Sequence, residues 1–271
     1  MADGTWRPED LPWERFDPSS LDDDLLKVVK AASLVESNGA DYATYLCNVF
    51  DDDPDFQAAA KAWAAEEVQH GAVLARWAAL ADPSFDFAAR FRRFTAGYAI
   101  PRDAAASVRG SRAGELVARC IVEVGTSSYY TALADASEEP LLKAICRRIA
   151  ADELRHYKLF YDHLNRYLAR ERIGRWRRIR VALGRIVESE DDELAYAYFA
   201  ANSEGAAYER RRWSQAYLQR AYRYYRRDHL RRAVAMTFKA AGLDPKSRLA
   251  GLVTKLGYRT LRLRLALGRA V

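Results

Sequence analysis

Two copies of one short pattern, Glu-x-x-His, constrain the fold of this chain more than any other feature. The two copies are Glu67 with His70 and Glu153 with His156. On a helix, residues three positions apart lie on one face about one turn apart, so each pair can bind one metal ion. One pair alone means little, because chance produces such a match fairly often. Two pairs in register indicate an internal repeat of metal-binding helices.

Each pair has a glutamate upstream at nearly the same interval. Glu36 precedes Glu67 by 31 residues, and Glu123 precedes Glu153 by 30. Both upstream glutamates follow an apolar pair on a segment that we expect to be buried helix, where an unpartnered carboxylate is costly. Four carboxylates neutralise two divalent ions, and two imidazoles leave coordination positions open for oxygen. We therefore predict a two-metal site whose ligands are Glu36, Glu67, His70, Glu123, Glu153 and His156.

The cysteines argue against other metal sites. Cys47, Cys120 and Cys146 lie far apart and form no CxxC pair. This pattern excludes a rubredoxin-type iron site and a disulfide framework. A zinc site usually has fewer carboxylates and some thiolate, so zinc is disfavoured as well.

Turn signals divide the chain into an all-α architecture of two helical hairpins. We expect helices over about 21–50, 54–80, 111–136 and 137–170, with Ser137 as the N-cap of the last. The intervening segment 82–110 is expected to be a long, partly ordered connection. Because a link of nearly 30 residues can run the full height of a bundle, the sequence predicts a four-helix bundle with up-down-down-up order.

The chain outside the bundle has a different character. We expect residues 1–20 to form an irregular N-terminal arm, residues 21–170 the bundle, and residues 171–271 a basic helical extension. Charge follows this division, with a net charge of −9 over residues 1–165 and +15 over residues 166–271. No signal peptide and no run of 18 apolar residues is present, so a cytoplasmic location is the expectation.

The motifs resemble those of the di-iron branch of the ferritin-like superfamily, which includes the rubrerythrins and the soluble acyl-carrier-protein desaturases. Residues 63–71 resemble the desaturase helix that carries Glu-Glu-x-x-His-Gly, and residues 150–156 resemble its later Ala-Asp-Glu-x-Arg-His motif. The likeness covers about residues 25–170. It implies a ferritin-like bundle that binds two iron ions, with manganese as an alternative at one or both positions. Thr126 matches a threonine beside the oxygen-binding face of those desaturases, which implies a catalytic role.

Three further residues are candidates for supporting the metal ligands. A metal-bound imidazole usually donates its other N–H to a carboxylate, and Glu66 and Asp152 are placed to serve the histidine of the opposite hairpin. The alternative for both is a solvated helix face. Tyr130 lies two turns beyond Glu123 on the same face. It is a candidate to support a metal ligand or to act as a redox-active group, and the alternative is plain core packing.

The leading functional hypothesis is a di-iron oxidase or oxygenase that activates O2 and acts on an acyl or lipid-like substrate. An external donor of the ferredoxin or rubredoxin type would supply electrons. The basic extension favours an acidic partner, either an acyl-carrier protein or an anionic membrane surface. Family analogy adds a homodimer as a candidate assembly. The chain is much shorter than typical acyl-carrier-protein desaturases, so its substrate channel and product can differ from theirs.

Two other functions remain open at this point. One is a rubrerythrin-like peroxidase or ferroxidase. The other is a non-catalytic basic helical protein that binds a membrane surface or partner through residues 166–271. Leucines of the last segment can line one face of an interfacial helix, or that face can pack on the bundle. The apolar residues of this face are Leu249, Leu252, Val253, Leu256 and Leu263. No nucleic-acid-binding motif is present, so we expect no nucleic-acid partner.

Overall fold

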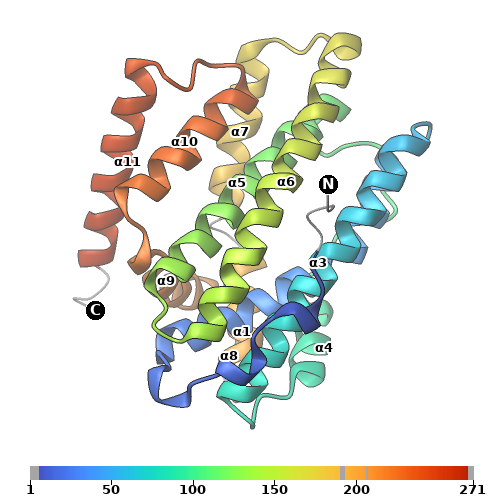
Figure 1. Ribbon diagram of the computed structural model, residues 1–271. Coiled ribbons are helices and arrows are strands. Elements are labelled where there is room, and N and C mark those ends of the chain that lie inside the picture. Colours follow the sequence, from blue (N-terminus) through green and yellow to red (C-terminus); the bar gives the residue numbers. More distant parts are fainter. Residues whose placement is uncertain (1–5, 190–192, 206, 268–271) are drawn as a thin grey trace.

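The computed structural model describes residues 6–189, 193–205 and 207–267, and within these ranges the chain is helical and contains no strand. Figure 1 shows long helices packed side by side, with shorter ones around them. The helices of the first part are α1 (Asp23–Ser37), α2 (Gly39–Val49), α3 (Pro54–Ala81), α4 (Phe87–Gly97), α5 (Arg112–Ala136) and α6 (Pro140–Glu171). Those of the second part are α7 (Arg175–Ser189), α8 (Glu193–Asn202), α9 (Arg210–Ala221), α10 (Arg227–Ala241) and α11 (Arg248–Leu267). Short 3-10 turns occupy Pro8–Asp10, Trp13–Arg15, Pro18–Ser20 and Tyr222–Tyr224.

The first hairpin pairs α1 and α2 with α3. The prediction of one continuous helix over 21–50 is wrong at its centre, because α1 ends at Ser37 and α2 begins at Gly39. The break lies where the chain approaches α3 most closely. A Cβ on Gly39 would stand 2.7 Å from the Glu67 Cβ, and one on Gly71 would stand 2.2 Å from the Ser37 Oγ. Only glycines at these two positions allow that approach.

The second hairpin pairs α5 with α6. Ser111 caps α5 by accepting a hydrogen bond from the Gly114 N–H. The N-cap of α6 is Glu139 and not Ser137, because the Glu139 carboxylate accepts from the first N–H groups of α6 while Ser137 ends α5. Pro140 at the first helical position costs no hydrogen bond. The ends of both helices are thus fixed by local side chains.

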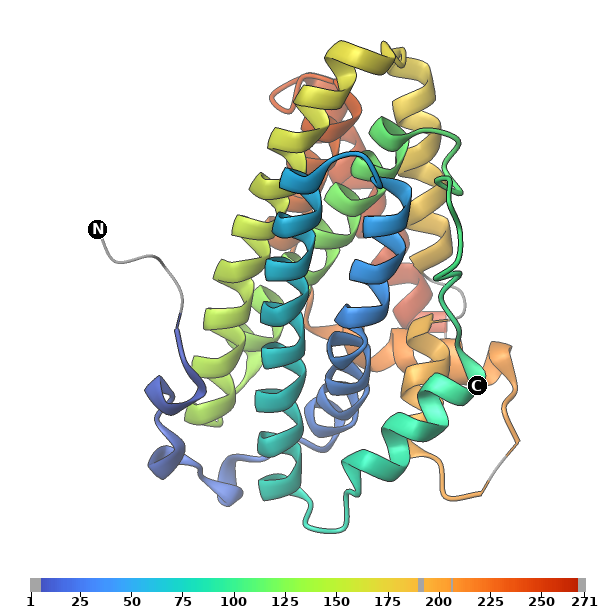
Figure 2. The ribbon, with the colours of Figure 1, turned by 90° about the vertical axis from the view of Figure 1, so that its right-hand side faces the viewer.

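The connection between the hairpins contains a helix that the sequence analysis did not predict. Asp86 caps α4 by accepting from the Ala89 N–H, and Phe94 of α4 is fully buried. Figure 2 shows the chain turning from α3 into α4 at one end of the bundle, after which the link extends to the other end, where α5 begins. The connection is therefore better ordered than expected, and it spans the length of the hairpins.

Buried apolar side chains form two large clusters, and the buried acidic residues and histidines lie between them. The first cluster joins α1 to the second half of α5, with Leu34 and Tyr130 among its members. The second joins α2 to the first half of α5, with Leu46 and Leu116 among its members. Two apolar regions thus flank a polar layer at the middle of the hairpins.

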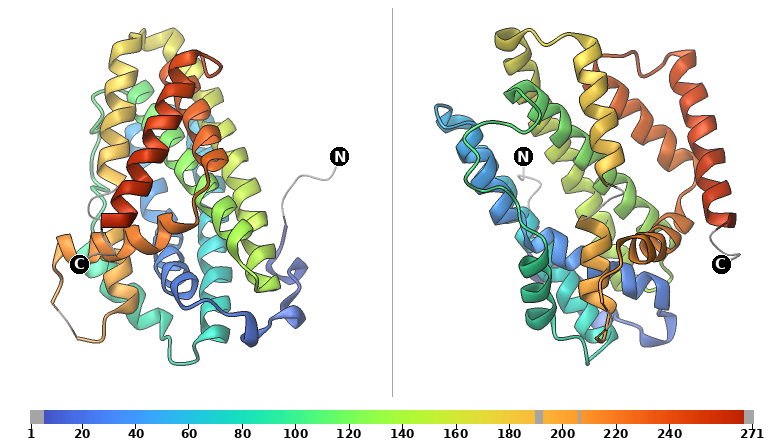
Figure 3. Two further views of the ribbon diagram at one scale, coloured as in Figure 1. Left: turned by 90° about the vertical axis from the view of Figure 1, so that its left-hand side faces the viewer. Right: turned by 180° about the vertical axis from the view of Figure 1, so that it is seen from behind.

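The second part of the chain packs on the outside of the hairpins. Helix α8 lies on α1, whereas α7 and α10 lie on α5. Helix α11 packs on α10 at the edge of the molecule (Figure 3). The alternative in which the leucine face of this helix packs on the bundle is wrong. Its five predicted members are between 38% and 60% exposed. Within the described ranges, no helix is both long and apolar enough to cross a membrane.

Candidate metal centre

Six acidic and histidine side chains from four helices meet in the polar layer at the middle of the hairpins. They are the six that the repeat predicts as ligands, and each is at most 6% exposed: Glu36, Glu67, His70, Glu123, Glu153 and His156. The helix period explains the convergence. Residues three apart face the same way, so each Glu-x-x-His pair presents both side chains to the centre.

The six side chains form two overlapping groups, each of which could hold a metal ion. One group consists of Glu36, Glu67, His70 and Glu153, and the other of Glu67, Glu123, Glu153 and His156. Within each group the potential ligand atoms lie within 4.8 Å of one another. Glu67 and Glu153 belong to both groups. They are therefore placed to bridge two ions, whereas Glu36 and Glu123 each serve one side.

Distances from the imidazole nitrogens describe the same arrangement. His70 Nδ1 lies 3.4 Å from Glu153 Oε1 and 3.8 Å from Glu67 Oε2. His156 Nδ1 lies 2.9 Å from Glu67 Oε1 and 3.6 Å from Glu153 Oε2. Each histidine therefore faces both shared carboxylates through Nδ1, the nitrogen that points to the centre.

The hydrogen bonding of these atoms tests whether the site suits metal ions. Among the described residues, five inward-facing atoms are buried without a hydrogen-bond partner, namely Glu67 Oε1, His70 Nδ1, Glu123 Oε1, Glu153 Oε1 and His156 Nδ1. Buried polar atoms without partners are rare, because each has lost its hydrogen bonds to water. Here all five face one space, and all are atom types that bind divalent cations. The donor set therefore fits metal binding.

Electrostatics in the absence of metal lead to the same conclusion. Burial, together with the neighbouring carboxylates, raises the pKa of Glu36 and of Glu123 well above the usual range. Burial lowers the pKa of His70, but the hydrogen bond to Asp152 and the contacts with Glu153 and Glu67 outweigh it, so the pKa is raised. A cluster that must retain protons to limit its negative charge can exchange them for cations.

Outside the cluster, each histidine has a carboxylate partner on its second ring nitrogen. His70 Nε2 lies 2.9 Å from Asp152 Oδ2, and His156 Nε2 lies 2.9 Å from Glu66 Oε2. Each contact joins α3 to α6. Arg155 donates hydrogen bonds to both carboxylates. These contacts orient both rings so that Nδ1 faces the centre.

Thr126 and Tyr130 also contact the cluster, both from α5. The Thr126 hydroxyl donates to Glu153 Oε2 at 2.7 Å. The Tyr130 hydroxyl donates to Glu36 Oε1, and Tyr130 is only 1% exposed. Tyr130 therefore both fills the core and holds a carboxylate of the cluster.

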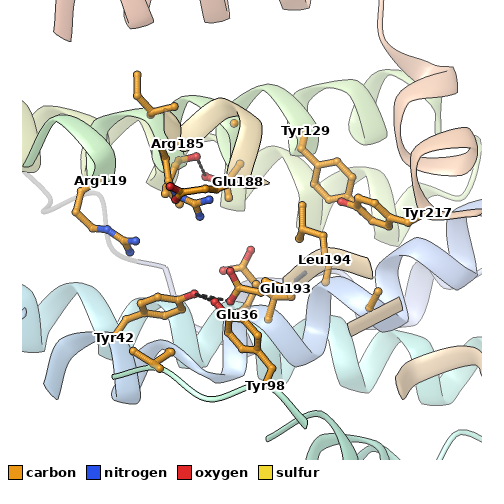
Figure 4. Close-up of a pocket in the computed structure, with 18 of the residues that line it drawn as sticks. Glu36, Tyr42, Tyr98, Arg119, Tyr129, Arg185, Glu188, Glu193, Leu194 and Tyr217 are labelled. Atoms are coloured by element: carbon orange, nitrogen blue, oxygen red, sulfur yellow. Dashed lines mark hydrogen bonds between the residues drawn. The ribbon is translucent and has the colours of Figure 1, made fainter. Parts of the chain in front are cut away.

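A cavity of about 440 Å³ adjoins the cluster on the side of Glu36 and Thr126. It lies between α1 and α5, and residues of α7, α8 and α9 also line it. Figure 4 shows Arg119 and Arg185 at one end, Glu36 near the middle, and Tyr129, Tyr217 and Leu194 at the other end. The volume is in the range of pockets that bind small molecules.

Sequence reasoning missed several residues of this region. Trp6 of the N-terminal arm donates a hydrogen bond from Nε1 to Asp152 Oδ2 at 2.7 Å, and nothing local in the sequence predicts that contact. Arg119 has a signal that could have found it. It precedes Glu123 by four residues and therefore shares its helix face. Arg155 likewise follows Asp152 by three.

Comparison with known proteins gives one positive finding. The model of a family described as fatty acid desaturase matches residues 17–177, which is more than half of the chain and contains the whole acidic and histidine cluster. No curated protein matches the chain. The matched segment ends at the start of α7, so most of the outer helices lie beyond it.

Proposed function

The chain belongs to the fatty acid desaturase family, and from this premise we propose that it is a di-iron oxidase or oxygenase that activates O2 and oxidises an acyl or lipid-like substrate. We assign two iron ions to the cluster, with manganese as an alternative, and the ligands Glu36, Glu67, His70, Glu123, Glu153 and His156. We further assign the two hairpins to a ferritin-like four-helix bundle, and the protein to the cytoplasm.

The observation that carries this proposal is the set of five buried, inward-facing atoms without hydrogen-bond partners among the described residues. Two ferrous ions, when bound, supply two electrons for the reduction of O2. The four carboxylates balance the four positive charges, so the site needs no counter-ion. The two apolar clusters flank the site along the hairpins and limit the access of water from those two sides.

The residues around the cluster have separate tasks in this proposal. Asp152 and Glu66 hold the histidine rings, whereas Thr126 and Tyr130 hold Glu153 and Glu36 from the side of the cavity. In a desaturation, two hydrogen atoms leave the substrate, and two electrons from an external donor together with two protons from the solvent complete the reduction of O2 to two water molecules. A ferredoxin or rubredoxin is the donor class that we propose.

Iron stoichiometry and oxygen consumption test the proposal. The full-length protein, loaded anaerobically with ferrous iron and desalted, should retain about two irons per chain. Glu67→Ala, which removes a carboxylate common to both groups, should lower this number to one or none. The matched control is Glu138→Ala, because Glu138 is exposed and remote from the cluster. Equal iron content in Glu67→Ala and the wild type would exclude the assigned site.

The substrate class is tested by the same preparation. Oxygen consumption that rises with an acyl substrate and a reduced ferredoxin supports the oxidase. Hydrogen peroxide consumption that needs no organic substrate would instead identify a rubrerythrin-like peroxidase.

A further inference from the structure

The cavity beside the cluster has one strongly polar end. Arg119 of α5 is 6% exposed, and its Nε has no hydrogen-bond partner among the described residues. The nearest carboxylate oxygen, Glu115 Oε1, lies 3.9 Å from the Arg119 Nε, and the ring of Tyr42 lies 4.9 Å from the guanidinium carbon. A buried arginine with free donors is costly unless an anion binds to it.

The carboxylates near Arg119 are already engaged. Glu115 Oε2 accepts hydrogen bonds from the Tyr45 and Ser107 hydroxyls at 2.8 and 2.7 Å. Glu193 accepts from the Tyr42 hydroxyl. At the same end of the cavity, Arg109 is bound through both of its terminal nitrogens to Glu188. The Nε of Arg119 thus has no hydrogen-bond partner at the cavity, whereas Glu115, Glu193 and the Arg109–Glu188 pair are engaged; Arg185 lies at the same end (Figure 4).

The other end of the cavity is apolar and aromatic. Its walls include Leu194, Tyr129 and Tyr217. Glu36, a member of the cluster, lies between the two ends (Figure 4). Thr126, which donates to Glu153 of the cluster, also lines the cavity. Arg119 and Thr126 are seven residues apart on one helix, which places their backbones about 10 Å apart along its axis. A molecule that spans the cavity would therefore lie with its middle beside the cluster.

We propose that this cavity binds a discrete small amphiphile, whose carboxylate binds the guanidinium of Arg119 inside the protein and whose apolar part lies between Tyr129, Tyr217 and Leu194. This inference rests on the proposed function and names its substrate class. It differs from an acyl chain attached to a carrier protein, because the head group of such a chain stays outside. The walls formed by Leu194 and Tyr217 lie beyond the segment that matches the desaturase family.

Binding of decanoate tests the proposal without any turnover. Isothermal titration calorimetry of the full-length, ferrous-loaded protein under anaerobic conditions should show binding of decanoate and much weaker binding of decan-1-ol. Arg119→Gln should weaken decanoate binding about 10- to 100-fold, the effect of losing a charge-assisted hydrogen bond. The matched control is Arg180→Gln, which removes an exposed arginine of α7 and should bind decanoate like the wild type.

A second variant covers the case in which Arg119→Gln fails to fold. A Cβ on Gly125 would meet nothing within 4 Å, and Gly125 lines the cavity, so Gly125→Leu should fold and lose decanoate binding by obstruction. Decanoate binding that Arg119→Gln and Gly125→Leu leave unchanged would overturn the proposal, as would decan-1-ol binding equal to that of decanoate. A wild type that binds decanoate through Arg119 but consumes no O2 would contradict the proposed function alone.

Helix α11 carries an independent feature, an exposed apolar stripe. Leu249, Leu252, Leu256, Leu263 and Leu267 follow one another at helical spacing and are 50–62% exposed. The opposite face, with Ala250 and Thr254, is buried against the rest of the molecule. An apolar stripe of this length is unusual on a surface that faces only water.

Cations flank the stripe on both sides, and α11 contains no acidic residue. On a helical projection, Arg248, Lys255, Arg259 and Arg262 lie along one edge of the stripe, and Arg264 lies along the other. Pairing this face with a second copy of itself would bring like charges together, which argues against a dimer here. An anionic lipid surface offers acyl chains to the leucines and phosphates to the cations.

We propose that α11 lies in the interface of an anionic membrane, with its leucine stripe inserted among the head groups. Co-sedimentation with vesicles tests this. The full-length protein should bind phosphatidylglycerol vesicles at least tenfold more tightly than phosphatidylcholine vesicles. The double variant Leu252→Asp, Leu256→Asp should lose this binding. Leu80→Asp, which changes an exposed leucine of α3, should keep it.

Two outcomes would overturn the membrane assignment. One is wild-type protein that stays in solution with phosphatidylglycerol vesicles. The leucine stripe of α11 would then be a candidate binding site for an acidic protein. The other is a dimer, seen by sedimentation velocity, that the double variant converts to a monomer, because a second copy would then cover the stripe. The substitutions lie on exposed positions, so an unchanged melting temperature shows that each variant is folded.

Discussion

His70 on α3 and Asp152 on α6 are in direct contact, with 2.9 Å between His70 Nε2 and Asp152 Oδ2. With Nε2–H donating a hydrogen bond to this carboxylate, Nδ1 is the nitrogen that faces the cluster and can bind a metal ion. Trp6 and Arg155 also donate to Asp152, which is only 3% exposed. The Asp152 carboxylate therefore links the N-terminal arm to both hairpins. It also sets the orientation of His70, a predicted metal ligand.

Replacement of Asp152 should weaken metal binding without removing a ligand. In Asp152→Asn the contact with His70 loses its charge, so the imidazole becomes a poorer donor. We expect ferrous affinity at one of the two sites to fall about 10- to 100-fold. Anaerobic competition with a chelator measures this change. Asp162→Asn is the control, because Asp162 is an exposed residue of the same helix that pairs with the exposed Lys158. Equal affinities in the two variants would show that Asp152 does not support the site.

Thr126 should affect the rate and not the iron content. Its hydroxyl donates to Glu153 Oε2 at 2.7 Å and lines the cavity. Thr126→Val keeps the shape but removes the donor, so we expect two irons per chain and oxygen consumption at least about tenfold slower. Thr126→Ser should restore most of the rate. Loss of iron in Thr126→Val would instead indicate that the hydroxyl only positions a ligand.

The ion pair between Lys30 and Asp82 gives a pH-dependent prediction for stability. The hydrogen bonds from Lys30 and Ser84 lower the pKa of Asp82 from 3.8 to about 2. A lowered pKa in the folded state means stabilisation that is complete above the unfolded pKa of 3.8 and is lost as the pH falls through about 2. Asp82→Asn should therefore lower the free energy of unfolding by about 1–2 kcal/mol at pH 7 and by clearly less at pH 3.

Urea unfolding of the metal-free protein at pH 7, 5 and 3 measures this difference. Asp103→Asn, which changes an exposed aspartate of the connection, is the control and should leave the stability unchanged. If Asp82→Asn lowers the free energy of unfolding as much at pH 3 as at pH 7, Asp82 acts through packing and not through its charge.

The parts of this molecule that could be predicted from the sequence are those that depend on local periodicity. The Glu-x-x-His spacing places Glu67 beside His70, and the repeat places Glu153 in the equivalent position on the other hairpin, so their convergence needed only the assumption of two helices. The break after Ser37 has a local signal that the sequence analysis did not use, because Asn38-Gly39 is a dipeptide typical of turns. The close approach of Gly39 to Glu67 of another helix is not reported by any local pattern.

The cavity could not be predicted from the sequence, because it depends on contacts between helices that are far apart in the chain. Its walls combine α1 and α5 with Arg185, Leu194 and Tyr217 from three later helices. Tertiary packing alone decides which face of each later helix points inward. The basic composition of this region predicted its charge but did not predict that Arg119, from the acidic front half, would be a buried cation whose Nε has no hydrogen-bond partner among the described residues.

Two glycines in helix interiors should respond to alanine with opposite signs. Gly125 in α5 has open space around its missing Cβ, so Gly125→Ala gains helix propensity without a clash. We expect about 1 kcal/mol of stabilisation, or a melting temperature higher by about 2–4 °C. A Cβ on Gly71 in α3 would stand 2.6 Å from the Ser37 backbone nitrogen, so Gly71→Ala must push α1 away and should cost about 1–3 kcal/mol. Thermal unfolding followed by circular dichroism compares the two variants, and changes of the same sign would contradict the close approach of α1 to α3.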